Sequence, residues 1–142
     1  MKNLVSLIDV NVIMDYLLER EGYFEYAQRL FEYCSDSIID GYVAFHSMSI
    51  ISYVLRKHHP AEECRQALYQ VTDLLTVVSA SHNAVVYAIG DENFSDFEDC
   101  LQEKCALNIN ADYIVTNDVK DFAASQVKAV TPAELLKIIF NS

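Results

Sequence analysis

Apolar and polar positions follow two alternating patterns along the chain. Leu4–Ile8 is a short apolar run that stops at Asp9, which predicts a buried strand. Apolar side chains three and four residues apart then predict a helix over Asn11–Arg20, and Gly41 is expected to break the chain. The patterns recur, with strands predicted at Tyr42–Phe45, Thr76–Ser79, Tyr113–Thr116 and Val127–Val130, and helices at Phe24–Asp36, Ser47–Lys57, Ala61–Leu75, His82–Ile89, Ser95–Leu107 and Ala133–Phe140.

Two of the predicted helices carry start signals. Ser95 followed by Glu98 has the form of a capping box, and Pro132 stands in the favoured first turn of the last helix. Short strands that alternate with helices are typical of a parallel sheet covered on both faces, so we expect an α/β fold. Because no repeat, low-complexity segment or linker interrupts the pattern, residues 1–142 are expected to form one domain.

The composition narrows the class of protein. Hydrophobic residues make up 52% of the chain, with only 3 Gly and 2 Pro, as in a compact globular domain. The formal net charge of −11 argues against a basic protein that coats DNA and against a membrane-surface helix. The 4 cysteines form no CxxC pair, and no apolar run has the length of a signal peptide core or a membrane span. We therefore expect a cytoplasmic protein with reduced thiols and no membrane contact.

Acidic residues follow predicted strands or begin a predicted helix. They are Asp9, Asp96, Asp99, Asp118 and Asp121. Because ligands of parallel sheets bind at the carboxyl ends of strands, Asp9 and Asp118 stand where a site is expected. Carboxylates that converge repel one another, and a bound cation relieves that repulsion. Oxygen ligands alone favour Mg²⁺ or Mn²⁺, the cations that serve phosphodiester hydrolysis.

Each of these acids also has an ordinary structural interpretation. Asp9 is placed to cap the helix that follows it, and Asp118 to form a turn. Asp96 and Asp99 would stabilise the dipole of their helix, Asp121 would cap a helical turn, and Glu98 is assigned to the capping box.

Basic and aromatic residues give weaker signals. Arg56 and Lys57 form the basic run of the chain and either bind RNA phosphates or offset the dipole at a helix end. Most aromatic residues, such as Phe31, Tyr53 and Phe97, fall at positions expected to face the core. Tyr23 and Tyr26, with their neighbour Phe24, lie near the first loop and are candidates for exposure.

Three segments together resemble a PIN domain, of the type found in VapC toxins and PilT N-terminus-like proteins. They are LIDVNVIMDYLLER, YVAFHSMSIISYVLRK and FSDFEDCLQEKCALNINADYIVTNDVKDF. The resemblance implies a three-layer α/β/α sandwich with a central parallel sheet and a ribonuclease that depends on Mg²⁺ or Mn²⁺. It implies catalytic carboxylates at Asp9, Asp99 and Asp118.

The resemblance also assigns roles to residues around these three acids. Asp121 is expected to be an accessory carboxylate. Asn11 is expected to be a polar residue behind the metal ligands, and Thr116 a hydroxyl near the metal or the substrate phosphate.

The chain departs from the PIN pattern in one place. Active PIN domains usually carry a Glu in the helix after the second strand, and the corresponding stretch, SMSIISYVLRK, has no acid. The matching position is Ile50, with Ser49 and Ser52 nearby, and Asp96 is the candidate to substitute. Since a hydroxyl binds Mg²⁺ far more weakly than a carboxylate, we expect weaker metal binding than is usual in the family.

Two functions stay open at this point. The first is a metal-dependent ribonuclease, the toxin of a type II toxin–antitoxin pair, with an antitoxin partner and a homodimeric state implied by the resemblance. The second is a weakened or inactive PIN module that binds RNA or a protein. A receiver domain is disfavoured because no Asp lies between Asp40 and Asp73, and a haloacid-dehalogenase phosphatase because Asn11 replaces the second Asp of its Asp-x-Asp motif.

Overall fold

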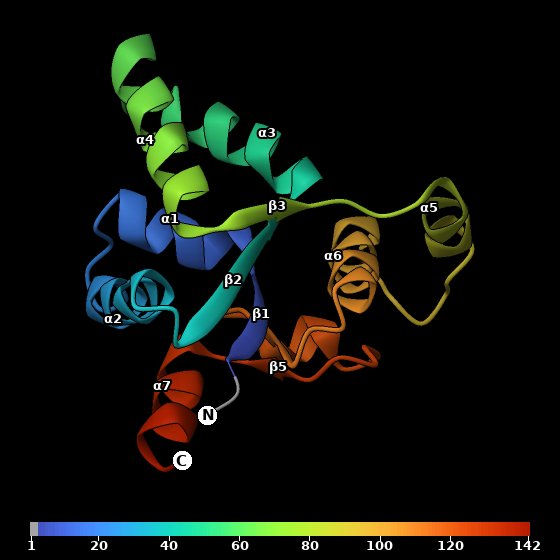
Figure 1. The fold of residues 1–142 in the computed structure, drawn as a ribbon. Helices are drawn as coiled ribbons and strands as arrows, with labels where there is room; N and C mark the ends of the chain where they lie inside the picture. The colour runs from blue at the N-terminus through green and yellow to red at the C-terminus, as the bar shows by residue number, and fades with distance from the viewer. Residues whose placement is uncertain (1–2) are drawn as a thin grey trace.

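A single parallel sheet organises the computed structural model, which describes residues 3–142 (Figure 1). The strand order is β3-β2-β1-β4-β5, and every neighbouring pair is parallel. The strands are β1 Leu4–Ile8, β2 Ile39–Ala44, β3 Thr76–Val78, β4 Tyr113–Val115 and β5 Ala129–Val130. The helices are α1 Val10–Leu17, α2 Phe24–Ser35, α3 Phe45–Leu55, α4 Ala61–Leu74, α5 His82–Ile89, α6 Phe97–Asn108, the 3₁₀ turn η1 Val119–Phe122 and α7 Pro132–Phe140.

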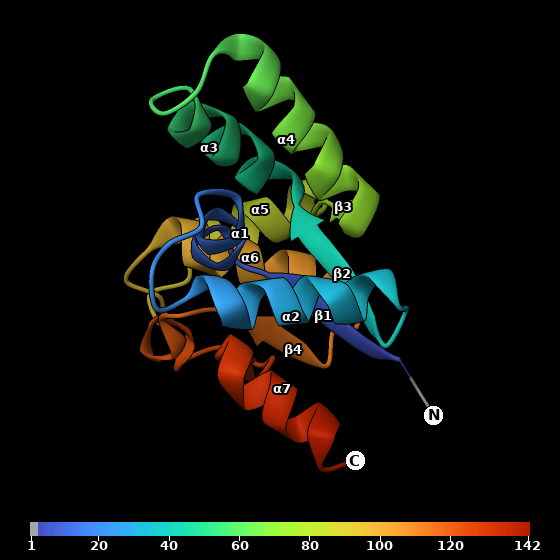
Figure 2. The ribbon, with the colours of Figure 1, turned by 90° about the vertical axis from the view of Figure 1, so that its left-hand side faces the viewer.

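Helices cover both faces of the sheet, which confirms the predicted α/β/α sandwich. Helices α1, α2 and α7 lie on one side, and α6 with α5 lies on the other (Figures 1 and 2). The side chains of β1 alternate between two cores: Ile8 packs with the α1–α2 side, and its neighbour Leu7 packs with the α6 side. Burial on both faces explains why every residue of β1 except Ser6 is apolar.

The predicted elements are all present, but two local signals were interpreted wrongly. Helix α6 begins after Asp96, whose side chain accepts the Glu98 N–H at 2.8 Å, so Ser95 does not form a capping box with Glu98. The capping box lies at α7, where Thr131 and Glu134 each bind the other's backbone N–H.

Gly41 also has a different role from the one predicted. It lies inside β2, and a Cβ there would come within 2.6 Å of Leu75 Cδ2 and 3.0 Å of Cys34 Sγ. The glycine therefore permits the close approach of its neighbours rather than breaking the strand.

The aromatic residues divide differently from the prediction. Phe31 is buried as expected, whereas Tyr53 is 62% exposed and Phe97 48% exposed, so these two do not contribute to the core. Tyr23 and Tyr26 are also exposed, which confirms the prediction made from their place near the first loop. Phe24, predicted with them, is instead partly buried and stacks on the Tyr16 ring.

The cysteines are unpaired, and the helices are too short or too polar to cross a membrane, within the residues that the structure describes. Within the described residues all 4 cysteines are free thiols, and burial raises the pKa of Cys34 to about 12 and of Cys105 to about 11. No helix within residues 3–142 combines the length and the hydropathy needed to cross a membrane.

The strand order places a crevice at the carboxyl ends of β1 and β4. The chain leaves β1 toward β2 on one side, and β4 later joins β1 on the other, so the connections diverge between these two strands. Such a reversal leaves the strand ends uncovered, and ligands of open α/β sheets bind there. Asp9 and Asp118 follow these two strands.

Candidate functional site

Asp9 lies at the junction of β1 and α1, where it caps the helix and faces the crevice. Its Oδ1 accepts the Val10 N–H at 2.8 Å and the Gln102 amide at 3.0 Å, and its Oδ2 accepts the Thr116 hydroxyl at 2.8 Å. The residue is 8% exposed. Burial raises the pKa of Asp9, and these three hydrogen bonds together counteract part of that increase. Asp9 can therefore cap α1 and still offer its carboxylate to a ligand in the crevice.

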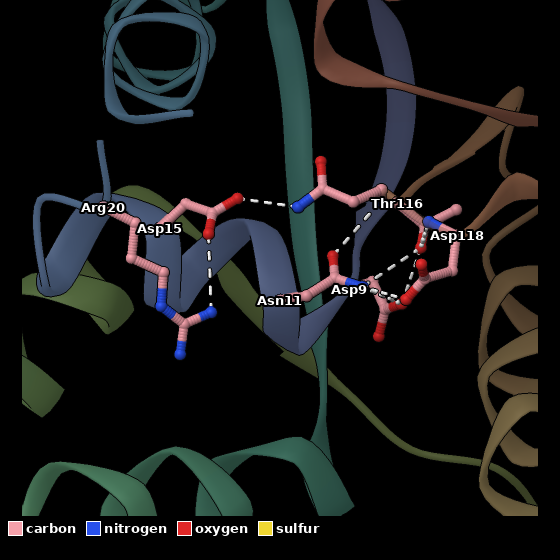
Figure 3. Close-up of polar contacts among 7 residues, drawn as sticks. Asp9, Asn11, Asp15, Arg20, Thr116 and Asp118 are labelled. Atoms are coloured by element: carbon pink, nitrogen blue, oxygen red, sulfur yellow. Dashed lines mark hydrogen bonds and ion pairs between the residues drawn. The ribbon is translucent and has the colours of Figure 1, made fainter. Parts of the chain in front are cut away.

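The turn after β4 brings Asp118 to Asp9 through a short network of hydrogen bonds. Thr116 Oγ1 accepts the Asp118 N–H at 3.0 Å while donating to Asp9 (Figure 3). Asn11 donates from Nδ2 to Asp118 Oδ2 at 3.1 Å, and its Oδ1 accepts the Asn117 N–H at 3.2 Å. Asn11 and Thr116 thus hold the two carboxylates in a fixed relation. The repulsion between those carboxylates further raises the pKa of Asp9.

A buried acid on α1 anchors the same turn from behind. Asp15 is 3% exposed, and its Oδ2 accepts the Asn117 amide at 2.7 Å. Its Oδ1 pairs with Arg20 at 3.4 Å, so the charge is compensated inside the protein (Figure 3). Asp15 is therefore a structural carboxylate that fixes the loop bearing Asp118.

Helix α6 contributes the third carboxylate. The pKa of Asp99 is raised to about 7, first by burial and then by repulsion from Asp96, Asp9 and Asp121 in that order. The predicted acids are therefore close enough to interact, although they come from three separate segments of the chain. Asp96 and Asp121 are exposed, and Asp121 lies on the η1 turn, whose N-cap is Asp118.

Glu98 is a fourth acid on the first turn of α6. Burial raises its pKa, followed by repulsion from Asp9 and Asp96. Its carboxyl is near Asp9 rather than tied to the start of the helix, so its assignment to a capping box was wrong.

The charge of this cluster is not paired with a basic side chain of the residues that the structure describes. Among residues 3–142, no Lys or Arg forms an ion pair with any of the five predicted acids. The donor set consists of carboxylate oxygens, the chemistry that Mg²⁺ and Mn²⁺ prefer. The oxygens of Asp9, Asp99 and Asp118 do not all lie within 4.8 Å of one another, so a cation would have to draw them closer.

Another acidic group, Asp91, Cys100 and Glu103, has ligand atoms within 4.8 Å of one another. Its charge is already compensated, because Glu103 accepts from Lys104 Nζ and from the Gln126 N–H, each at 2.8 Å. Burial raises the pKa of Cys100, which keeps the thiol protonated. This group is a poor candidate for a metal site.

Sequence patterns missed two polar residues behind Asp9. Gln102 is fully buried, and its Nε2 donates to Asp9 and, at 3.2 Å, to Ser47 Oγ. Gln102 lies one helical turn beyond Asp99, a spacing that could have revealed it. Ser47 is the α3 hydroxyl that reaches this network, whereas Ser49 bonds back to the carbonyl of His46.

Arg56 and Lys57 lie away from the carboxylates. Helix α3 starts at the strand ends and these residues follow its last turn, roughly 15 Å along its axis. Both are exposed, and Lys57 Nζ lies 4.5 Å from the centre of the Tyr53 ring. The basic run is therefore separate from the acidic cluster.

A cavity of about 490 Å³ between α1, α2 and α4 also contains none of the predicted site residues.

The structure is an α/β/α sandwich with carboxylates at the point where the connections of a parallel sheet diverge, which defines the class of α/β protein. The chain belongs to the PIN domain family, whose model matches residues 6–120. PIN domains are typically nucleases.

The solved structures of similar fold include VapBC proteins and a toxin–antitoxin complex. The chain resembles VapBC-1 from nontypeable Haemophilus influenzae, with a TM-score of 0.67 and 16% identity, over 92% of this chain and 99% of that one. It also resembles a toxin–antitoxin complex from Klebsiella pneumoniae, with a TM-score of 0.67 and 18% identity, over 89% and 97%. The third is VapBC2 from Rickettsia felis bound to a promoter DNA fragment, with a TM-score of 0.66 and 14% identity, over 90% and 98%. A comparison with curated proteins gave no match.

Proposed function

We propose that this protein is a metal-dependent ribonuclease and the toxin of a toxin–antitoxin pair, acting as a single PIN domain over residues 1–142. The observation that carries the proposal is the network in which Thr116 and Asn11 hold Asp9 and Asp118 together, with Asp99 near enough to Asp9 for the two carboxylates to repel each other. Among residues 3–142, no Lys or Arg pairs with these acids. Membership of the PIN family and the likeness in fold to toxin–antitoxin proteins support it.

Asp9, Asp99 and Asp118 would hold Mg²⁺ or Mn²⁺, with Asp96 and Asp121 at the exposed rim. When bound, the cation supplies a Lewis acid that activates water and neutralises phosphate charge. Thr116 and Gln102 fix the Asp9 carboxylate by donating to its two oxygens, at 2.8 Å and 3.0 Å.

Asn11 would orient Asp118 in the same way, through the hydrogen bond to its Oδ2. Because these donors are already in place, the Asp9 and Asp118 carboxylates are oriented before the substrate arrives.

RNA cleavage with Mg²⁺ or Mn²⁺, and its loss in chelator, tests this proposal. Asp9→Asn and Asp118→Asn should each abolish cleavage, whereas Asp73→Asn, an exposed change on α4, should not. Intact RNA under every metal condition, with wild type and Asp9→Asn behaving alike, would overturn the enzymatic function.

A weakened PIN module that binds RNA or a protein is the second candidate, and a specific observation favours it. Helix α3 offers no carboxylate, and the hydroxyl that reaches the site, Ser47, is engaged by Gln102. The two functions differ in one result: the module would bind RNA or its partner with Asp9 intact, yet release no cleavage product.

The partners are part of the same proposal. An antitoxin would bind this chain, as the toxin–antitoxin complex of similar fold suggests, and two copies of the chain would form a homodimer. Arg56 and Lys57 would contact RNA phosphates distant from the scissile one. Because the chain carries a net charge of −11, RNA binding should depend on the cation, and binding unchanged in chelator would contradict this.

A further inference from the structure

A second recess opens next to the carboxylates, on the side of α2 and α7. It has a volume of about 260 Å³. Its lining comes from the loop before α2, the turn after β4 and the start of α7: Gly22, Tyr23, Tyr26, Asn117, Asp118, Thr131, Pro132 and Ala133. These three segments lie side by side at the strand-end edge of the molecule (Figure 2).

The start of α2 presents two tyrosines to this recess, one at the N-cap of the helix and one in its first turn. Gly22 has φ +85°, a left-handed conformation that a side chain would strain, and it turns the chain into α2. Tyr23 is the N-cap of α2 and Tyr26 follows three residues later, so the two rings share one face of the helix. They are 53% and 49% exposed, and the core face of α2 is formed by other residues. Packing of the fold therefore does not account for them.

The recess shares a wall with the proposed metal site. Asp118 lines it, and the Asp118 carboxylate is the one that Asn11 holds beside Asp9. Asn117 also lines it and is fixed by Asp15. A nucleotide whose phosphate lies at the carboxylates would therefore reach the recess with its own base or with that of its neighbour.

We propose that this recess receives one nucleobase of the RNA strand, stacked on Tyr23 or Tyr26. The recess is slightly smaller than the pockets that bury drug-sized ligands, which suits a single planar ring system. No Lys or Arg lines it and Asp118 does, so it disfavours a phosphate and accepts a neutral ring with polar edges. Aromatic side chains bind bases of single-stranded RNA in this way. The inference rests on the proposed function, since it takes the scissile phosphate to lie at Asp118.

Oligoribonucleotides that carry one abasic nucleotide, moved along the strand, test the recess directly. In the wild type with Mn²⁺, the abasic change should raise KM at one position relative to the cut. Tyr23→Ala or Tyr26→Ala should raise KM about 5- to 150-fold, the range that base–aromatic stacking provides. Tyr→Phe at the same position should retain most of the affinity, because the ring and not the hydroxyl stacks. In the alanine variant the abasic change should add no further defect.

Tyr69→Ala is the matched control, since Tyr69 on α4 is 60% exposed and lies outside the recess. Equal KM for every abasic position, or alanine variants at Tyr23 and Tyr26 that behave like Tyr69→Ala, would overturn the inference while leaving the nuclease intact. Loss of binding to a partner protein with unchanged RNA kinetics would assign the recess to a protein and overturn it as well.

The inference has a readout that does not require catalysis. If no RNA is cleaved, binding of the same oligonucleotides in Ca²⁺, followed by fluorescence anisotropy, still compares the alanine variants with the control. Weaker binding in Tyr23→Ala or Tyr26→Ala alone would support the recess and reject only the nuclease. Equal binding in all variants, or none in the wild type, would reject the recess.

Discussion

Replacing Asp99 with Asn should stabilise the metal-free protein above neutral pH. Burial, followed by the repulsion of Asp96, Asp9 and Asp121, raises the pKa of Asp99 from 3.8 to about 7. Between these values the folded chain keeps a proton that the unfolded chain has released, so this group lowers the free energy of unfolding as pH rises. The loss is complete above the folded pKa and absent below the unfolded one. Because Asn does not ionise, the Asp99→Asn variant does not lose this stability as pH rises.

The size of the effect follows from the shift in pKa. At about 1.4 kcal/mol per pKa unit, the full change corresponds to about 4 kcal/mol. Asp99 is partly exposed, and solvent screening there reduces the contribution to about 1–2 kcal/mol. For a domain of 142 residues this equals an increase in Tm of roughly 3–8 °C.

Differential scanning calorimetry in chelator, at about pH 8 and about pH 3, measures the change. Asp99→Asn should melt above the wild type at the higher pH and together with it at the lower, and the exposed control Asp73→Asn should follow the wild type at both. Saturating Mn²⁺ at about a hundredfold its Kd should stabilise the wild type by about 2.7 kcal/mol and Asp99→Asn by less. Equal Tm values in chelator at the higher pH, with equal responses to Mn²⁺, would refute this account of Asp99.

Three further changes test other parts of the structure. Gln102→Leu removes the amide that donates to Asp9, but it also removes the buried Oε1 of Gln102, which accepts no hydrogen bond, so thermal melts should show a loss of stability of only about 1 kcal/mol. Calorimetric titration should show weaker Mn²⁺ binding, and unchanged Mn²⁺ affinity would contradict a role of Gln102 in holding Asp9. Gly41→Ala should lower the free energy of unfolding measured in urea by about 1–3 kcal/mol, because the new Cβ would lie 2.6 Å from Leu75 Cδ2. An unchanged free energy of unfolding would show that the Leu75 side chain moves aside at no cost. Ile50→Glu restores an acid at the position that the family pattern implies and should tighten Mn²⁺ binding; an unchanged Kd would show that the glutamate does not reach the cation.

The fold could be predicted because periodicity and alternation both report burial. Leu4–Ile8 is apolar at every position except the buried Ser6, since the central strand of a covered parallel sheet has no solvent face. The boundaries were less predictable, as the start of α6 shows: Ser95 and Asp96 are both good caps, and three-dimensional context selected Asp96.

The strand-end acids were predictable and their supporting residues were not. Asp9 and Asp118 could be found because strand ends meet at one edge of a sheet. Gln102 and Ser47 lie on different helices, and only the packing of α6 and α3 against Asp9 brings them together. Neither residue type carries a motif of its own; only the spacing of one helical turn from Asp99 marks Gln102, and nothing local marks Ser47.

The pairing of β1 with β4 has a consequence for synthesis on the ribosome. Asp9 is made early, but its hydrogen-bond donor Thr116 is made 107 residues later. Thr116 is held in turn by β5, where its N–H donates to the Val130 carbonyl at 2.9 Å. A nascent chain that ends before Thr116 therefore carries Asp9 without this donor, and one that ends before Val130 carries Thr116 without its hydrogen bond to β5. If the proposed function holds, the strand order would delay RNA cleavage until translation has passed Val130, which would separate production of the nuclease from its activity.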